Sequence, residues 1–197
     1  MKRRDFITTF AASGLALAAG GAAASTARTI PSYDLPPHML PQIVPIEMGA
    51  GARPYEIHVD PDEFALYWTL PDNTAMRYVV GVGRPGLYEA GEFFVGARKE
   101  WPSWTPTPGM IERQPELYAK HADGMAGGLE NPLGSRALYL FQPDRGDTFL
   151  RIHGTNDPAT LGQRVSNGCA RLVNDQMVDL YNRIPMGTRV VLYEPLA

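Results

Sequence analysis

The sequence predicts a mainly β fold, a β-sandwich or a barrel-like pair of sheets, with one or two short helices. Between residues 55 and 194, short runs of alternating apolar and polar residues recur, and Pro, Asp, Asn and Gly separate them. Such spacing, without long helices between the runs, is typical of antiparallel all-β domains. About 170 residues would remain after removal of a leader, which is enough for one domain with its own core.

The first three expected strands form an antiparallel meander. Residues 55–60 alternate in polarity, Pro61-Asp62 provides a turn, and residues 64–70 return. A second turn at Pro71-Asp72-Asn73 leads into the third strand. In chain order, strands are expected at residues 55–60, 64–70, 76–82, 93–97, 137–141, 148–153 and 188–193.

Two segments have the features of helices. Pro115 suits the first position of a helix over residues 115–120, because proline lacks the amide hydrogen that a first turn leaves unpaired. In the second segment Asn174 is the expected N-cap, and Pro185 and Gly187 end the helix. The buried stripe of this helix is expected to comprise Met177, Val178, Leu180, Tyr181 and Ile184.

The first 24 residues have the pattern of a twin-arginine signal peptide. Arg3-Arg4 precedes an uncharged run from Phe6 to Ala24, which closes with the small residues Ala22-Ala23-Ala24 that a signal peptidase favours. A retained membrane anchor is the alternative, although this run is rich in Ala, Gly, Ser and Thr and only weakly hydrophobic. We therefore expect export to the periplasm by the twin-arginine route.

Residues 25–54 are expected to form a proline-rich, extended lead-in along the surface of the domain. Six prolines in this segment rule out a long helix or a central strand. Residues 55–194 then make up the folded domain proper.

The charge balance argues against binding to nucleic acid or to an anionic membrane surface. The chain carries 18 Lys and Arg against 21 Asp and Glu, and the leader holds three of the basic residues but one acidic residue. The remainder is therefore more acidic, and it has no basic run. Contact with a membrane is expected only through the signal segment, if that segment is uncleaved.

Cys169 is the single cysteine of the chain, so it cannot form an internal disulfide. An unpaired thiol in an oxidising compartment is either inert packing or a nucleophile. His153 lies sixteen residues upstream at the end of an apolar run, and its imidazole could lower the thiol pKa and move a proton. A zinc site would need two further ligands at a recognisable spacing, so no metal or cofactor is expected. The remaining histidines are assigned to the surface: His38, His58 and His121.

The turn before Cys169 has the composition of an oxyanion hole. Gly168 and the small Ala170 flank the cysteine, so the backbone N–H groups of Gly168 and Cys169 could face a substrate oxygen. No acidic residue is an obvious partner for the second ring nitrogen of His153. We expect the backbone carbonyl of Gly154 to orient the ring instead.

These residues form a pattern that closely resembles the catalytic domain of the YkuD-type L,D-transpeptidases, also called the ErfK-YbiS-YcfS-YnhG type. The pattern is His153-Gly154-Thr155-Asn156, twelve intervening positions from His153 to Ser166, and then Ser166-x-Gly168-Cys169-x-Arg171. Segments 78–84, 101–110 and 131–140 are also similar to this family. The resemblance covers about residues 55–194 and implies the β-sandwich of that family.

The resemblance implies an enzyme that acts on peptidoglycan stem peptides. The thiolate of Cys169 would attack the carbonyl between diaminopimelate at position three and D-alanine at position four. D-Alanine would leave, and an amine would resolve the thioester to give a 3→3 cross-link or to attach an envelope protein. A carboxypeptidase, endopeptidase or amidase would use water as the acceptor at the same site. A non-catalytic wall-binding protein is the remaining alternative.

The resemblance also implies roles for the surrounding residues. His153 would act as base and then as acid, and a group of loop residues would form the oxyanion turn or orient the ring: Ser166, Asn167, Gly168 and Gly154. Four further residues would brace the site or contact substrate: Arg171, Asn156, Thr155 and Trp104.

Two features depart from the family, and two further segments are expected beside or over the site. Asn167 stands where many relatives have a histidine, and residues 87–93 differ from their usual turn, so acceptor specificity is expected to differ too. The aromatic segment 101–110 either lines the substrate cleft or forms a proline-stiffened flap over a sheet edge. The glycines around residues 124–128 are those of a mobile lid.

Overall fold

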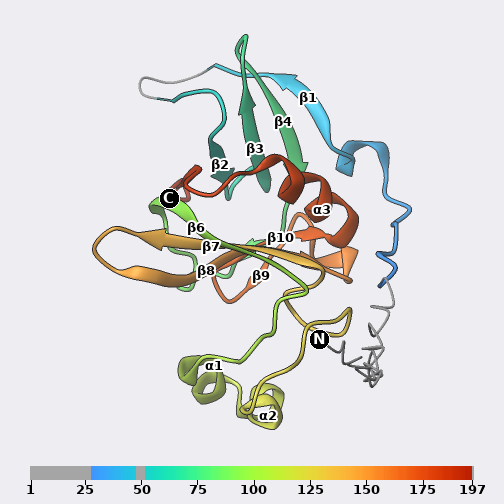
Figure 1. Ribbon diagram of the computed structural model, residues 1–197, viewed down its shortest axis with the longest axis vertical. Helices are drawn as coiled ribbons and strands as arrows, with labels where there is room; N and C mark the ends of the chain where they lie inside the picture. Colours follow the sequence, from blue (N-terminus) through green and yellow to red (C-terminus); the bar gives the residue numbers. More distant parts are fainter. Residues whose placement is uncertain (1–27, 48–51, 197) are drawn as a thin grey trace, which may run out of the picture.

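The computed structural model describes residues 28–47 and 52–196, and within them nine strands form one mixed sheet (Figure 1). The hydrogen-bonded order is β1-β4-β3-β2-β11-β6-β7-β8-β10, and β5 pairs with β9 in a separate two-stranded sheet. The expected leader, residues 1–24, lies outside the described residues. The strands are β1 (Gln42–Pro45), β2 (Ile57–Asp60), β3 (Ala65–Leu70), β4 (Thr74–Val79), β5 (Val82–Gly83), β6 (Gly91–Glu100), β7 (Arg136–Gln142), β8 (Gly146–Thr155), β9 (Arg164–Ser166), β10 (Ala170–Val173) and β11 (Arg189–Leu192).

The mainly β fold expected from the sequence is confirmed, and the meander β2-β3-β4 is antiparallel as expected. In its second turn Asp72 and Asn73 have φ angles of 63° and 53°, a left-handed conformation that these residue types tolerate. The third expected strand is divided, because β4 ends at Val79 and β5 starts at Val82. Strands β1, β9 and β10 were not expected.

The helices are short apart from α3 (Asn174–Arg183); the others are α1 (Pro108–Arg113) and α2 (Pro115–Tyr118). The expected cap of α3 was wrong by one residue, because Val173 is the N-cap and Asn174 is already helical. The side chain of Asn174 is buried, and its Oδ1 accepts a hydrogen bond of 2.7 Å from the backbone N–H of Ser135. No helix within residues 28–47 and 52–196 is long and apolar enough to cross a membrane.

Helix α3 packs on β7, β8 and β10 and closes the main hydrophobic core. Met177 and Leu180 are fully buried, and Tyr181 and Ile184 lie beside them, whereas Val178 of the expected stripe is only half-buried. Strand residues that complete this core include Ile57, Leu66, Tyr78, Leu138, Ile152 and Leu172. The core therefore fixes β8 and β10 side by side.

The described part of the lead-in, residues 28–47, runs along one side of the domain in an extended path with a single short 3₁₀ turn, Pro37–Met39 (Figure 1). Tyr33, Leu35 and Met39 pack against a small buried cluster formed by Val79, Leu161 and Val173. Strand β1 then pairs with β4 at the edge of the sheet. An edge is where proline is tolerated in a strand, because one side of an edge strand makes no ladder hydrogen bonds.

A long excursion, which we call the flap (residues 101–134), separates the antiparallel strands β6 and β7. The flap contains α1 and α2, which project from the sheet in Figure 1. Paired backbone hydrogen bonds between Trp104 and Met125 join its two limbs. Asn131 is buried at its base, and its Nδ2 donates to the carbonyls of Met125 and Ala126.

Candidate active site

The flap, strand β8 and the turn before β10 enclose a cleft of about 500 Å³. Both Cys169 and His153 line it, together with Ser166, Asn167 and Arg171. The parallel pairing of β8 with β10 sets His153 opposite Arg171, so Cys169 lies further along the same side of the sheet. Sheet register thus brings together residues that are sixteen positions apart in the chain.

His153 is buried, and its ring orientation is fixed by one hydrogen bond. Its Nδ1 lies 2.8 Å from the backbone oxygen of Gly154. A carbonyl oxygen only accepts, so Nδ1 carries the hydrogen and Nε2 is left as the basic nitrogen. Gly154 has no room for a side chain, because a Cβ there would lie 2.3 Å from Oδ1 of Asn174. Asn174 therefore packs directly behind the group that orients the ring.

Ser166 and Gly168 determine the shape of the turn that carries Cys169. Ser166 Oγ accepts from the Gly168 N–H at 3.1 Å and donates to the Cys169 carbonyl at 2.6 Å. Gly168 has a φ of 117°, and a Cβ would lie 2.8 Å from the carbonyl oxygen of Leu87, so only glycine fits there. The sequence had suggested that the Gly168 N–H faces a substrate oxygen, but in the structure this N–H is bonded to Ser166.

Burial favours the neutral form of both candidate catalytic groups. Burial, together with the positive charges of Arg171 and Arg151, lowers the pKa of His153 to about 3, against the opposing effect of the hydrogen bond to Gly154. Burial also raises the pKa of the Cys169 thiol, against the opposing effects of the Arg151 backbone and of the guanidinium groups of Arg151 and Arg171. Among the described residues, no hydrogen bond joins the thiol to the ring. Such contacts are often long in unliganded enzymes and tighten when substrate binds.

The other expected site residues divide into two groups. Trp104 and Arg171 line the cleft; the Trp104 ring packs against Tyr118, and burial lowers the pKa of Arg171. Thr155 and Asn156 do not line it. Thr155 is buried, with its Oγ1 accepting from the Asp157 N–H, and Asn156 is exposed to solvent. Asn156 therefore lies outside the cleft lining, and Thr155 braces the loop that follows β8.

Asn167 is held by hydrogen bonds to two other segments. Its Nδ2 donates to the Tyr118 hydroxyl of the flap at 2.9 Å, and its Oδ1 accepts from Arg84 Nη2 at 3.1 Å. The same Arg84 nitrogen also lies 3.2 Å from Oε1 of Gln114. We call this set of contacts, Arg84-Gln114-Tyr118-Asn167, the flap latch.

Sequence reasoning missed three residues that line the cleft, Arg151, Arg113 and Tyr118. It also missed Arg84 and Gln114, the members of the flap latch that lie outside the cleft lining. Arg151 could have been found, since it lies two residues before His153 on one strand and so points to the same face. The latch residues come from segments 30 to 83 positions apart, and no sequence pattern joins them.

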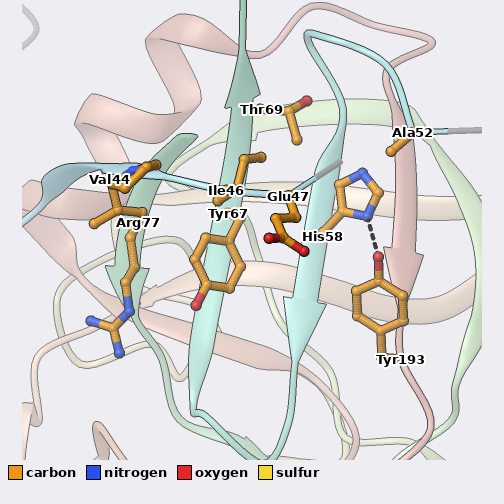
Figure 2. Close-up of a pocket in the computed structure, with 10 residues that line it drawn as sticks. Val44, Ile46, Glu47, Ala52, His58, Tyr67, Thr69, Arg77 and Tyr193 are labelled. Atoms are coloured by element: carbon orange, nitrogen blue, oxygen red, sulfur yellow. Dashed lines mark hydrogen bonds between the residues drawn. The ribbon is translucent and has the colours of Figure 1, made fainter. Parts of the chain in front are cut away.

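A second cavity, of about 400 Å³, lies between the end of the lead-in and the outer face of β2, β3 and β4, and shares no lining residue with the cleft (Figure 2). His58 lines this cavity, with its Nδ1 2.9 Å from the Tyr193 hydroxyl. The expectation that His58 is a surface residue was wrong, because the lead-in covers this face and leaves the residue 6% exposed. Burial lowers the pKa of His58. Within the described part of the chain, no three His, Cys, Asp or Glu side chains are close enough to hold a metal ion.

The domain is thus mainly β, and a cysteine and a histidine line one of its clefts. The model of the YkuD family, described as the L,D-transpeptidase catalytic domain, matches residues 54–192, and the chain belongs to this family. The chain is 34% identical over 145 residues to a probable L,D-transpeptidase, ErfK/SrfK, of Escherichia coli K12, over 70% of this chain and 44% of that protein. This chain thus spans less than half the length of that relative.

Solved structures agree with the fold. A Brucella melitensis protein described as a probable carnitine operon oxidoreductase is 45% identical, with a TM-score of 0.53 over 81% of this chain and 96% of that one. An L,D-transpeptidase of Enterococcus faecium is 17% identical, with a TM-score of 0.50 over 72% of this chain and 50% of that one. At this level of identity the second likeness concerns the fold alone.

Proposed function

We propose that this protein is a peptidoglycan L,D-transpeptidase in which Cys169 is the nucleophile and His153 transfers the proton. Family membership supports the reaction class. The single observation that carries the assignment is that both side chains line one cleft, with His153 Nδ1 held by the Gly154 carbonyl. That hydrogen bond leaves Nε2 as the nitrogen that can take the thiol proton.

The proposed reaction has two acyl-transfer steps. In the first, Cys169 Sγ bonds to the carbonyl carbon of diaminopimelate in a tetrapeptide stem, its proton passes through His153 to the leaving nitrogen, and D-alanine departs. In the second, an amine attacks the thioester, and the thiol regains a proton through the same ring. The acceptor is the side-chain amine of a second diaminopimelate or an amine of an envelope protein.

Because both groups are neutral at rest, the thiol must lose its proton as substrate binds, rather than being held as a preformed thiolate. The nearby guanidinium groups of Arg151 and Arg171 favour the anion once it forms. The Gly168 N–H is already bonded to Ser166. We therefore assign stabilisation of the tetrahedral oxyanion to the backbone N–H of Cys169.

The proposed location is the periplasm, reached by the twin-arginine route. The support is the pattern of residues 1–24 and a family whose substrate class lies in the cell wall.

The test is product analysis with a defined tetrapeptide donor and competing acceptor amines. The wild type should release D-alanine and form tripeptide-containing dimers, Cys169→Ala should form none, and His153→Ala should be slower by at least about 10²-fold. Free tripeptide as the sole product would favour the hydrolase alternative. Dimers formed by Cys169→Ala would refute the nucleophile assignment. A carbapenem should also leave a covalent adduct on the wild type, visible by intact mass, and none on Cys169→Ala.

A further inference from the structure

Beside the cleft lies a side cavity of about 490 Å³, which shares Leu87 and Arg113 with it. The other residues around the side cavity are Arg84, Pro85, Gly86 and Gln114. The side cavity therefore borders both the base of the flap latch and the end of α1. Neither Cys169 nor His153 lines it, so it can hold only a part of a substrate that is distant from the reacting bond.

The cleft and the side cavity together carry an uncompensated positive charge. Among the described residues, Arg84, Arg113 and Arg171 have no ion pair with a carboxylate, whereas Arg151 in the cleft is paired with Asp147. The acidic lining residue, Glu89, is itself paired with Arg145. Arg171 lines the cleft, Arg84 lines the side cavity, and Arg113 lines both. Three guanidinium groups without a carboxylate partner, in two adjoining cavities of a chain with net negative charge, favour an anionic ligand.

The two arginines of the side cavity are available for such a ligand. Arg113 is exposed on α1, and no hydrogen bond of its guanidinium is found among the described residues. Arg84 Nη2 contacts only neutral oxygens, those of Gln114 and Asn167, and its Nε is buried without a partner. Glu112 and Glu116 are neighbours of Arg113 in sequence, but neither lines either cavity. Guanidinium groups that have no carboxylate partner within the protein can bind a carboxylate of a ligand with charge-assisted hydrogen bonds.

We propose that the side cavity is a carboxylate-binding subsite, and that the preferred stem peptide presents a free carboxylate there, held between Arg113 and Arg84. This inference rests on the proposed function for the identity of the peptide. The subsite would recognise a part of the substrate that Cys169 and His153 do not contact. It would bind a peptide with the free carboxylate in preference to the corresponding carboxamide. An amide has nearly the same shape as the acid but lacks the charge, so the difference in affinity measures the subsite directly.

The experiment compares two probes on the full chain carrying Cys169→Ala, which binds without turnover. One probe is the tetrapeptide L-Ala-D-Glu-diaminopimelate-D-Ala with free side carboxylates. The other probe is the same peptide in which the free carboxylates of D-glutamate and diaminopimelate have been converted to carboxamides. Calorimetry should give at least about tenfold tighter binding of the free acid, and adding Arg113→Gln should reduce that ratio to below about threefold.

Two control variants separate the subsite from general charge and from folding. Arg113→Lys keeps the charge and should keep most of the preference, whereas Arg53→Gln removes an equal charge from an exposed residue outside both cavities and should leave the ratio unchanged. Equal affinity for the two peptides, or a full preference that survives Arg113→Gln, would overturn the subsite. A preserved preference in the Cys169→Ala protein, with no D-alanine released by the wild type, would instead refute the transferase and leave the subsite standing.

Discussion

At the residue scale, burial is the main influence on the protonation of both candidate catalytic groups. A thiol with a raised pKa and an imidazole with a pKa near 3 remain uncharged throughout the neutral range. A preformed thiolate–imidazolium pair would have the opposite shifts, with the thiol pKa lowered and the imidazole pKa raised. The difference can be measured on the free protein.

Alkylation of Cys169 by iodoacetamide should depend steeply on pH. Only the thiolate reacts, so the rate should keep rising above pH 9 and should be slower at pH 7 than for the same thiol in denatured protein. Cys169 is the sole cysteine, so intact mass reports this one site. A rate that is constant from pH 6 to 9 would contradict the neutral pair.

How far single residues could be assigned from sequence depended on whether their partners were local. Gly154 is adjacent to His153, and its carbonyl was the expected partner of the ring. Asn174 was misassigned as a helix cap, because its real partner, Ser135, is 39 positions away. Asn156 belongs to the recognisable motif but follows β8, where the chain leaves the sheet, so it turns to solvent.

At the scale of elements, the flap latch connects the flap to the turn that carries the Cys169 thiol. Trp104–Met125 pairing and Asn131 make the base of the flap rigid, and Tyr118 meets Asn167 next to the turn. A closed flap excludes water from a reaction intermediate. The latch would then favour an amine acceptor over water.

Replacing Tyr118 by Phe should shift the fate of the thioester. Loss of one hydrogen bond, worth about 1 kcal/mol, should raise the share that goes to water by about fivefold at a fixed amine concentration. Acylation by a carbapenem should stay within about twofold of wild type, because the turn itself is held by Ser166. Product ratios by chromatography give the first quantity and intact mass gives the second.

Tyr55→Phe is the matched control, because Tyr55 is 57% exposed and lies outside the cleft lining. An unchanged product ratio in Tyr118→Phe would show that the latch does not control the acceptor. A parallel loss of carbapenem acylation would mean that Tyr118 supports the turn instead.

Elements bounded by turn residues or marked by a clear apolar run could be predicted from the sequence, and elements without either feature could not. Prolines and Asp-Asn turns delimited β2 to β4, and the apolar runs located β7 and β8. Strand β10 has four residues and joins α3 directly, so no turn residue separates the two. Strand β9 has three residues and pairs only with the short β5, too little for a polarity pattern.

At the scale of the whole molecule, the lead-in is part of the folded unit rather than a spacer. Leu35 packs on the cluster of Val79, Leu161 and Val173, and Gln176 Nε2 donates to the Met39 carbonyl at 2.9 Å. The Tyr33 hydroxyl also lies 3.3 Å from Asn174 Nδ2, behind the His153 strand. These contacts connect residues before the family match to the candidate active site.

Leu35→Ala should lower the free energy of unfolding by about 1–2 kcal/mol, less than for a fully buried leucine because Leu35 is half-buried. Denaturant unfolding followed by tryptophan fluorescence would measure the loss. Leu40→Ala in the same segment is the control, since Leu40 is 43% exposed and should change stability by less than about 0.5 kcal/mol. Equal effects of the two substitutions would show that the lead-in adds no stability through this cluster.

The position of β1 also has a consequence for self-association. Within residues 28–47 and 52–196, no strand pairs with its outward side, which is one edge of the nine-stranded sheet. An unpaired edge could recruit a strand from a neighbouring copy and begin polymerisation. This border is four residues long, Pro41 precedes it and Pro45 ends it, so it offers few amide hydrogens to an incoming chain. We therefore expect the prolines that exclude a helix from this segment also to disfavour strand pairing between copies.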